Sequence, residues 1–355
     1  MRKFFIKSTL ILCGLLFAIA VVGHFVPQDE NTAAVPVVAE KVLVPGGQSV
    51  GVKMDVRGVL VVGLEEIACS DGEKVNPGLL AGLQIGDSIV LVNGQDVSKA
   101  DEVQTIVNQV HDTVRLKVRR NGRIVDITVS PVVSAEDGLY KLGVWVKDKT
   151  AGIGTLTYYD PSDATFGALG HGITDPETGS VLPVEKGLLL ESQVQEIEEG
   201  RSGEPGEIKG LFYHASQPLG NLDKNSGFGV FGTAYHPVEN PLYSKPLAIG
   251  TRDQVRTGKA YILSTLASNE VRRFEIEIVK VEKQKKPADK GMVIRVTDKE
   301  LLEESGGIVQ GMSGSPIIQN DRIIGAVTHV FVSDPAQGYG IYIEWMLQES
   351  DIVEK

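Results

Sequence analysis

A serine placed between glycines is the residue of this sequence best suited to covalent chemistry. Ser313 follows Gly311 by two residues and directly precedes Gly314. Small neighbours let the backbone turn tightly and expose the hydroxyl, and they aim the N–H groups of Gly311 and Ser313 at the position of a developing oxyanion. Glycines also surround serines in turns without chemistry, so the motif needs partners elsewhere in the chain.

A base and an acid for this serine both precede it. His171 lies in a Gly-His-Gly segment after an apolar run, and Asp298 ends a β-branched segment fifteen residues before Ser313. An imidazole that removes the serine proton, and a carboxylate that orients this imidazole, complete an acyl-transfer site. Chymotrypsin-like enzymes supply the carboxylate well before the serine, which keeps other candidates open. These alternatives are Asp175, Asp223 and Asp253.

Composition excludes several classes of protein. The 355 residues carry 35 Lys and Arg against 46 Asp and Glu, a net charge of −11 without a basic stripe, so we expect no nucleic-acid partner. The six histidines show neither i,i+4 pairing nor an HExxH pattern, so we expect no metal and no cofactor. A hydrophobic content of 42% and 40 glycines suit compact β-rich domains.

Residues 1–27 predict a basic cytoplasmic tip followed by a membrane anchor or export signal. Arg2, Lys3 and Lys7 precede an uncharged apolar run from Thr9 to Gly23. Basic residues before such a run favour a cytoplasmic N terminus and export of the rest of the chain. Residues 28–40, which lack periodicity, predict a linker.

Residues 41–133 predict a small α+β module. Between Asn76 and Gln95 a short glycine-closed helix, a Gly-Asp turn and a strand ending in Asn-Gly follow one another. This run closely resembles the corresponding pattern of PDZ domains. The resemblance implies that an extended peptide adds to an edge strand at residues 50–54, beside a helix at residues 101–111. Its terminal carboxylate would be held by Ser49, Val50, Gly51 and Val52.

Residues 134–355 contain many short apolar runs separated by glycine, proline and asparagine, which predict a β-barrel domain. The run at residues 280–290 predicts a solvated hairpin loop, and residues 343–350 predict the one good helix. The succession of serine turn, strand, Gly-x-Tyr strand and helix is similar to the closing segment of chymotrypsin-like proteases. By this similarity Thr328 and His329, on the strand after the serine, are candidate groove residues; the alternative, which we favour for His329, is a buried histidine. The expected fold is mainly β: a membrane segment, a PDZ-like module and a chymotrypsin-like double β-barrel.

Together, these segments resemble the stage IV sporulation protein B peptidases of endospore-forming bacteria. The resemblance covers essentially the whole chain and is carried by the leader, the PDZ-like module, the Gly-His-Gly segment, Thr297-Asp298 and the serine segment through Phe331. It implies that Ser313 is the nucleophile, His171 the general base and Asp298 the acid.

The same resemblance implies a cellular role. The protein would be exported across the forespore inner membrane, remain anchored, and then be released into the intermembrane space by self-cleavage. It would also cleave a membrane-bound regulatory protein and so activate a late sigma factor, with the PDZ-like module recognising the chain itself and its substrate.

Two other hypotheses remain open from the sequence. The protein is either an exported scaffold whose serine turn is structural, or a protease held shut until a peptide engages the PDZ-like module. No acidic residue lies between Gly306 and Gly311, so we expect no strict preference for Arg or Lys in the substrate.

Overall fold

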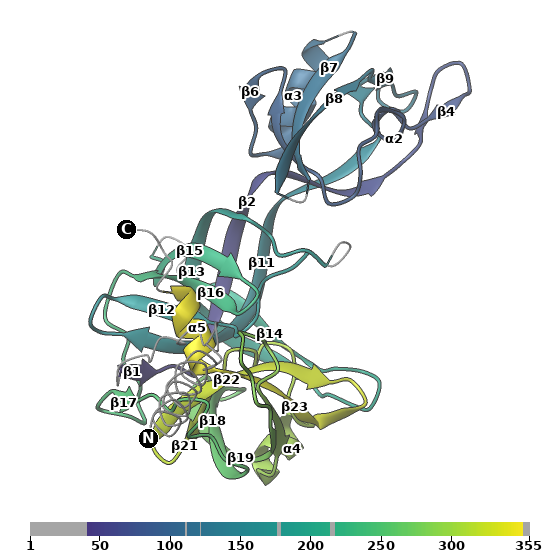
Figure 1. Ribbon diagram of the computed structural model, residues 1–355. Helices are drawn as coiled ribbons and strands as arrows, with labels where there is room; N and C mark the ends of the chain where they lie inside the picture. The colour runs from purple at the N-terminus through teal and green to yellow at the C-terminus, as the bar shows by residue number, and fades with distance from the viewer. Residues whose placement is uncertain (1–40, 111, 121, 176–178, 214–216, 351–355) are drawn as a thin grey trace, which may run out of the picture. The chain divides into compact units, whose positions relative to one another are not determined.

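The computed structural model describes residues 41–350 apart from residues 111, 121, 176–178 and 214–216 (Figure 1). The predictions for the leader at 1–27 and the linker at 28–40 lie outside the described residues. Within the described ranges, no helix has the length and apolar character that a membrane span requires.

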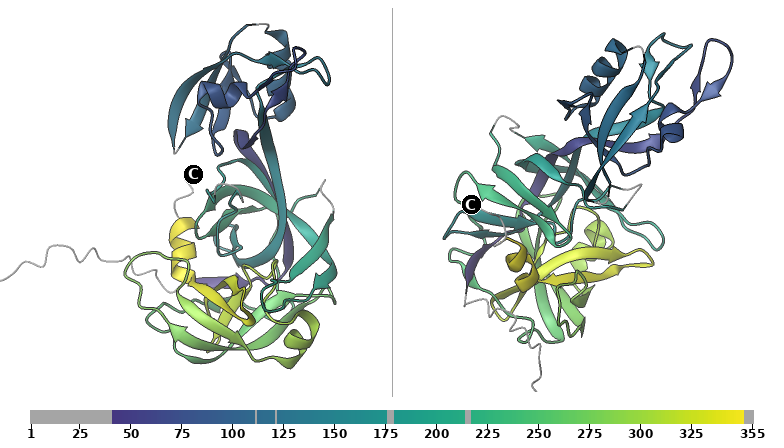
Figure 2. Two further views of the ribbon diagram at one scale, coloured as in Figure 1. Left: turned by 90° about the vertical axis from the view of Figure 1, so that its right-hand side faces the viewer. Right: turned by 45° about the horizontal axis from the view of Figure 1, so that its top comes forward.

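The first barrel closes through one pairing between strands far apart in the sequence. Six strands follow the order β11-β12-β16-β15-β13-β2, and β2 also pairs with β11, which completes the ring (Figure 2). Their bounds are β2 Ser49–Leu64, β11 Val144–Asp160, β12 Thr165–Ala168, β13 Val184–Glu198, β15 Gly220–Ser226 and β16 Gly229–Ala234. Val50, Val52 and Met54 alternate along β2 and are buried in one core with Leu156 and Phe166, as the period of two in a strand requires. Seven more strands extend this 13-stranded sheet, four of them in the unit described below; the other three are β1 Val42–Pro45, β14 Glu207–Tyr213 and β17 Leu247–Ala248.

The second barrel is closed in the order β18-β19-β20-β23-β22-β21. Its strands are β18 Gly258–Thr265, β19 Val271–Val281, β20 Met292–Val296, β21 Pro316–Gln319, β22 Arg322–Phe331 and β23 Asp334–Tyr342. On β19, Phe274, Ile276 and Ile278 alternate into the barrel core. Helix α4 (Lys299–Ser305) precedes the serine segment, and the predicted C-terminal helix is α5 (Ile343–Ser350). The structure therefore confirms a mainly β fold and contains two barrels.

A third unit has its own core and the local features predicted between Asn76 and Gln95. Its elements are β3 Ile67–Ala68, β4 Lys74–Val75, α2 Pro77–Ala81, β5 Ser88–Val92, β6 Gln95–Asp96, α3 Ala100–Gln109, β7 Val114–Arg120, β8 Arg123–Val129, β9 Val132–Val133 and β10 Tyr140–Lys141. Asn76 Oδ1 accepts the Leu79 N–H at 2.8 Å and caps α2, and Gly82 closes the helix in the left-handed conformation.

The two cores divide the chain differently from the predicted module at residues 41–133. Strand β2 is 16 residues long; Val50 and Met54 on its first part are buried in the first barrel, and Val59 and Val61 on its second part are buried in the α+β unit. The core of the α+β unit also reaches Leu142. Residues 41–54 thus belong to the barrel, because β2, which lies inside the predicted module, passes from the barrel core into the core of the α+β unit without a turn.

The peptide-binding loop predicted at Ser49, Val50, Gly51 and Val52 is wrong. Val50, Gly51 and Val52 pair with β11 on one side and with β13 on the other, and Ser49 pairs with Thr155. All four residues are buried. A strand whose edges are both occupied has no N–H groups left to hold an added peptide.

Asp298 has a structural role at the start of α4. Its Oδ1 accepts the N–H of Leu301 at 3.1 Å, and its Oδ2 accepts the N–H of Glu275 at 3.1 Å. The carboxylate therefore caps the helix and joins it to β19. The structure contradicts the prediction that Asp298 orients His171, whose Nδ1 instead lies 2.9 Å from the carbonyl oxygen of Gly172.

We expect Asp298→Ala to lower the free energy of unfolding by about 1–2 kcal/mol, because the cap of α4 is lost. Asp298→Asn should lose less stability than Asp298→Ala, since the carboxamide oxygen can still cap the helix, while the bond to the Glu275 N–H is lost because the amide nitrogen cannot accept. Urea denaturation of the two variants measures the difference. An equal loss in both variants would contradict the cap.

Candidate active site

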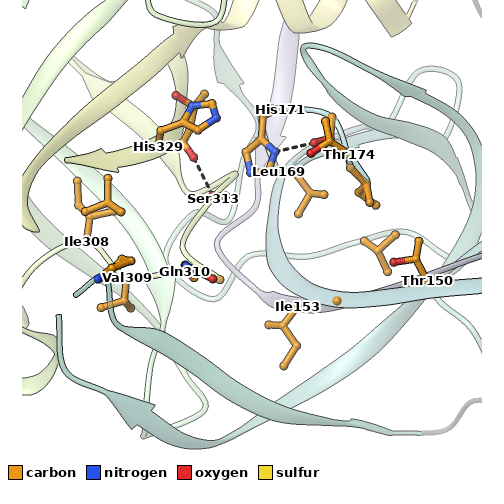
Figure 3. Close-up of a pocket in the computed structure, with 18 of the residues that line it drawn as sticks. Thr150, Ile153, Leu169, His171, Thr174, Ile308, Val309, Gln310, Ser313 and His329 are labelled. Carbon is orange, nitrogen blue, oxygen red and sulfur yellow. Dashed lines mark hydrogen bonds between the residues drawn. The ribbon is translucent and has the colours of Figure 1, made fainter. Parts of the chain in front are cut away.

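Ser313 and His171 lie on the wall of one cavity of about 440 Å³ (Figure 3). The wall contains residues of both barrels, including Ile153 from β11 and His329 from β22. The structure thus brings together the two residues that the sequence predicts as nucleophile and base, although 142 positions separate them in the chain.

The serine turn depends on two glycines with positive φ. Gly311 has φ +98° and Gly314 has φ +96°, a region that side chains strongly disfavour. A Cβ on Gly314 would also lie 2.1 Å from the carbonyl oxygen of Thr155. The glycines therefore allow the turn to approach β11 closely.

Two threonines of β11 hold this turn. The N–H of Thr155 donates to the carbonyl of Ser313 at 2.9 Å, and its hydroxyl donates to the carbonyl of Gly311 at 2.8 Å. The hydroxyl of Thr157 donates to the carbonyl of Gly314 at 2.8 Å. Three carbonyls of the turn are thus fixed by the first barrel.

The same turn leaves two N–H groups available. In the described part of the chain, no protein acceptor binds the N–H of Gly311 or Ser313, and both residues are half-buried at the cavity. The neighbouring N–H groups are occupied, because Met312 donates to Val309 and Gly314 donates to Val327. Two open donors beside a serine are what binding of an oxyanion requires.

The hydroxyl of Ser313 donates to the carbonyl oxygen of Thr328 at 2.8 Å (Figure 3). Between the described side chains of Ser313 and His171 there is no hydrogen bond. Because the serine proton points to a backbone oxygen, the hydroxyl has to turn about its Cα–Cβ bond before an imidazole can remove the proton.

A backbone carbonyl fixes the tautomer of His171. Its Nδ1 lies 2.9 Å from the Gly172 oxygen, which only accepts hydrogen bonds, so Nδ1 carries the proton and Nε2 is the basic atom. Burial lowers the pKa of His171, and the bond to Gly172 and the charge of Asp289 oppose this shift. His171 is therefore neutral at pH 7 and able to accept a proton.

A second imidazole lies beside the first. The ring centroids of His171 and His329 are 5.1 Å apart, with 33° between their planes. The expectation of a buried His329 is wrong, since the residue is exposed at the cavity rim. Nearby protein still displaces enough water to lower the pKa of His329, and the charge on a protonated His171 lowers it further.

Asp289 is a carboxylate that the sequence analysis assigned only to a solvated loop. Its negative charge opposes the lowering of the pKa values of both His171 and His329, and its carbonyl oxygen accepts the Thr328 hydroxyl at 3.4 Å. The three alternative carboxylates, Asp175, Asp223 and Asp253, do not line the cavity. No local pattern marks Asp289, because it is close to the histidines only through the β19–β20 connection.

A second cavity of about 450 Å³ lies in the α+β unit. One side is α3, the helix predicted to flank a peptide groove, with Val103 and Val107. The other side is the start of β11, Val144–Val146, which pairs with β2 along one edge and, among the described strands, with none along the other. A groove between a helix and a free strand edge suits an added peptide strand.

Comparison with known proteins gives low similarity to solved structures. The PDZ domain of the SdrC-like protein from Listeria monocytogenes is 18% identical and covers 25% of this chain and 87% of its own, with a TM-score of 0.21. The Rv3671c protease from M. tuberculosis in its active form is 13% identical over 57% of this chain and 73% of its own, with a TM-score of 0.33. The HtrA-type protease AlgW with a decapeptide is 12% identical over 58% of this chain and 54% of its own, with a TM-score of 0.32. Among curated proteins, none matches the chain.

Two family models match the sequence. The PDZ domain model matches residues 76–120, within the α+β unit. The model described as SpoIVB peptidase S55 matches residues 138–347, more than half of the chain, and this range contains both His171 and Ser313. The chain belongs to the SpoIVB peptidase S55 family and is a serine peptidase.

Proposed function

We propose that the chain is a serine endopeptidase in which Ser313 is the nucleophile and His171 the general base. The observation that supports this assignment is the shared cavity of Ser313, His171 and the two open N–H groups of the serine turn. The hydrogen bond from the Ser313 hydroxyl to the Thr328 carbonyl then belongs to the state of the site before substrate binds.

The reaction follows from these positions. Ser313 Oγ turns from Thr328 toward Nε2 of His171, transfers its proton there and attacks the substrate carbonyl carbon. The N–H groups of Gly311 and Ser313 bind the oxyanion. The imidazolium returns its proton to the leaving amine as the peptide bond breaks. Water then attacks the acyl-enzyme with His171 as base, which releases the acid and restores the serine.

His171 works here without a carboxylate at Nδ1. The Gly172 carbonyl takes over the orienting role, because it keeps the proton on Nδ1 and leaves Nε2 free. A neutral carbonyl stabilises an imidazolium less than a carboxylate does. The charge of Asp289 supplies longer-range stabilisation of the protonated ring.

For the biological role we infer that the substrates are the chain itself and a membrane-bound regulatory protein. The family match supports the peptidase activity. We infer further that this cleavage belongs to a sporulation pathway between forespore and mother cell and activates a late sigma factor. The apolar leader would carry the peptidase across the forespore inner membrane and anchor it there, and self-cleavage would release it into the intermembrane space.

For the PDZ domain we propose a peptide groove between α3 and Val144–Val146. Aliphatic side chains line it from both sides, including Val103, Val107 and Leu142, and Gly143 has φ +70° in the loop that enters the strand. Such a groove favours an extended tail with aliphatic side chains. A scaffold without catalysis would need only this groove. Replacement of Ser313 therefore distinguishes a peptidase from a non-catalytic scaffold.

We expect Ser313→Ala to abolish self-cleavage, with a loss of at least about 10⁴-fold in rate, because the nucleophile is removed. Intact mass spectrometry of the full-length chain measures the processed fraction over time. Ser315→Ala is the matched control: Ser315 is fully buried, and within the described structure its hydroxyl has no hydrogen-bond partner, so processing should continue. Unchanged processing of Ser313→Ala would favour the scaffold.

We expect kcat/KM to rise with pH as His171 loses its proton, because only the neutral ring accepts the serine proton. Since burial holds the pKa of His171 below its usual value of 6.5, the midpoint of this rise should lie below pH 6.5. Cleavage rates of a peptide at subsaturating concentration between pH 4.5 and 8 give the midpoint. A midpoint above 6.5 would show that His171 is not the buried base described here.

We expect a hexapeptide ending in valine with a free carboxylate to change the fluorescence of Trp145, which is 61% exposed and lines the groove. The other tryptophan, Trp345, is buried, and replacing it with phenylalanine isolates the signal. The amidated peptide, which lacks the terminal charge, should bind at least about tenfold more weakly. If the two peptides bind equally, or Trp145 does not respond, the proposed groove is wrong.

A further inference from the structure

One wall of the active-site cavity is aliphatic. Ile308 and Val309 precede the serine turn and are almost fully buried, while Val330 and Val332 come from the end of β22 and its following loop. In Figure 3, Ile308, Val309 and His329 lie on one side of Ser313, and Thr150 and Ile153 lie on the other. Among the described residues that line the cavity, none is an aspartate, glutamate, lysine or arginine.

The free edge of β22 indicates how a substrate lies on this wall. Strand β21 pairs with β22 only as far as Ala326, and beyond it β22 pairs with β23 alone among the described strands. An extended substrate segment therefore has an open edge beside His329 and Val330. With the scissile carbonyl at the open N–H groups of Gly311 and Ser313, the side chain on the amino side of the cleaved bond falls between residues 308–310 and Val330.

The floor of this pocket is Ile308. A Cβ on Gly338 of β23 would lie 2.8 Å from Ile308 Cδ1, so the isoleucine side chain fills the space that the glycine leaves open. A deep slot for an aromatic ring or a long basic chain is thereby closed. The remaining room is shallow and bounded by branched aliphatic groups.

We propose that the peptidase cleaves after valine, leucine or isoleucine, whose side chain packs against Ile308, Val309 and Val330. The inference rests on the proposed function, since it concerns the pocket of that same site. Each methylene group that an aliphatic side chain buries in an apolar pocket raises kcat/KM by about tenfold to 200-fold. A charged side chain meets no oppositely charged partner among the described lining residues and loses its hydration.

Peptides identical except at the residue before the cleaved bond test this preference on the full-length chain. With alanine, valine, leucine, phenylalanine, lysine or aspartate at that position, kcat/KM for valine and leucine should exceed that for lysine and aspartate by at least about 100-fold. It should exceed that for phenylalanine by about tenfold. Comparable cleavage of the lysine or aspartate peptide would overturn the inference and leave the peptidase function intact, whereas no cleavage of any peptide would contradict both.

Ile308→Ala tests the floor of the pocket. The variant should raise the phenylalanine-to-valine ratio of kcat/KM at least about tenfold, because the space over Gly338 becomes available. A ratio within one enzyme does not depend on the folded fraction, so lost stability leaves the readout valid. Ile294→Ala removes an equally buried isoleucine on β20 that does not line the cavity, and its ratio should stay at the wild-type value. An unchanged ratio in Ile308→Ala would refute the assigned floor.

Val330→Asp tests the aliphatic wall of the cavity by placing a negative charge on it. Val330 is half-buried, so a carboxylate there keeps contact with water and should raise the lysine-to-valine ratio at least about tenfold. Val293→Asp is the control, because Val293 is also half-buried in the same barrel and lies outside the cavity lining. If both variants leave the ratio unchanged, Val330 does not contact the substrate side chain.

Discussion

The active site depends on three hydrogen bonds that cross from the first barrel to the serine turn of the second. Thr155 and Thr157, both buried, donate to the carbonyls of Gly311, Ser313 and Gly314. Each bond contributes about 1 kcal/mol, and a buried carbonyl left without its donor costs about 1–3 kcal/mol. Because three bonds converge on four consecutive residues, the turn has little freedom to move away from β11. The two open N–H groups owe their orientation to this constraint.

Strand β11 links this constraint to the rest of the fold. Its first residues, Val144–Val146, form one side of the groove in the PDZ domain, and its later residues hold the serine turn. The same strand closes the first barrel by pairing with β2. The predicted domain boundary at residue 133 would separate the groove from the strand that forms one of its sides. The proposed peptide groove and the proposed nucleophile, Ser313, are instead supported by one continuous strand.

The sequence is informative where the signal is local. Glycines around Ser313 and His171 predict tight turns, and alternation such as Phe274, Ile276 and Ile278 predicts strands, because backbone geometry imposes these patterns on neighbouring residues. Asp298 had a local signal that favoured its actual role: it directly precedes the helical segment Lys299–Ser305, where an N-cap belongs. No local signal showed that both edges of β2 are paired or that the charge of Asp289 lies near His171, since both features depend on which distant strands meet.

The electrostatic environment of His171 explains why Ser313 is not deprotonated before substrate binds. Burial disfavours the imidazolium, and the Gly172 carbonyl offers it only a dipole. A proton transfer from Ser313 is therefore unfavourable until another charge appears, and the oxyanion formed on substrate attack is such a charge. The serine hydroxyl meanwhile remains with Thr328, which offers a ready acceptor at 2.8 Å. A substrate that aligns along β22 beside Thr328 competes with the Ser313 hydroxyl for the Thr328 carbonyl. Substrate binding therefore both brings the carbonyl carbon to the site and favours release of the serine hydroxyl from Thr328.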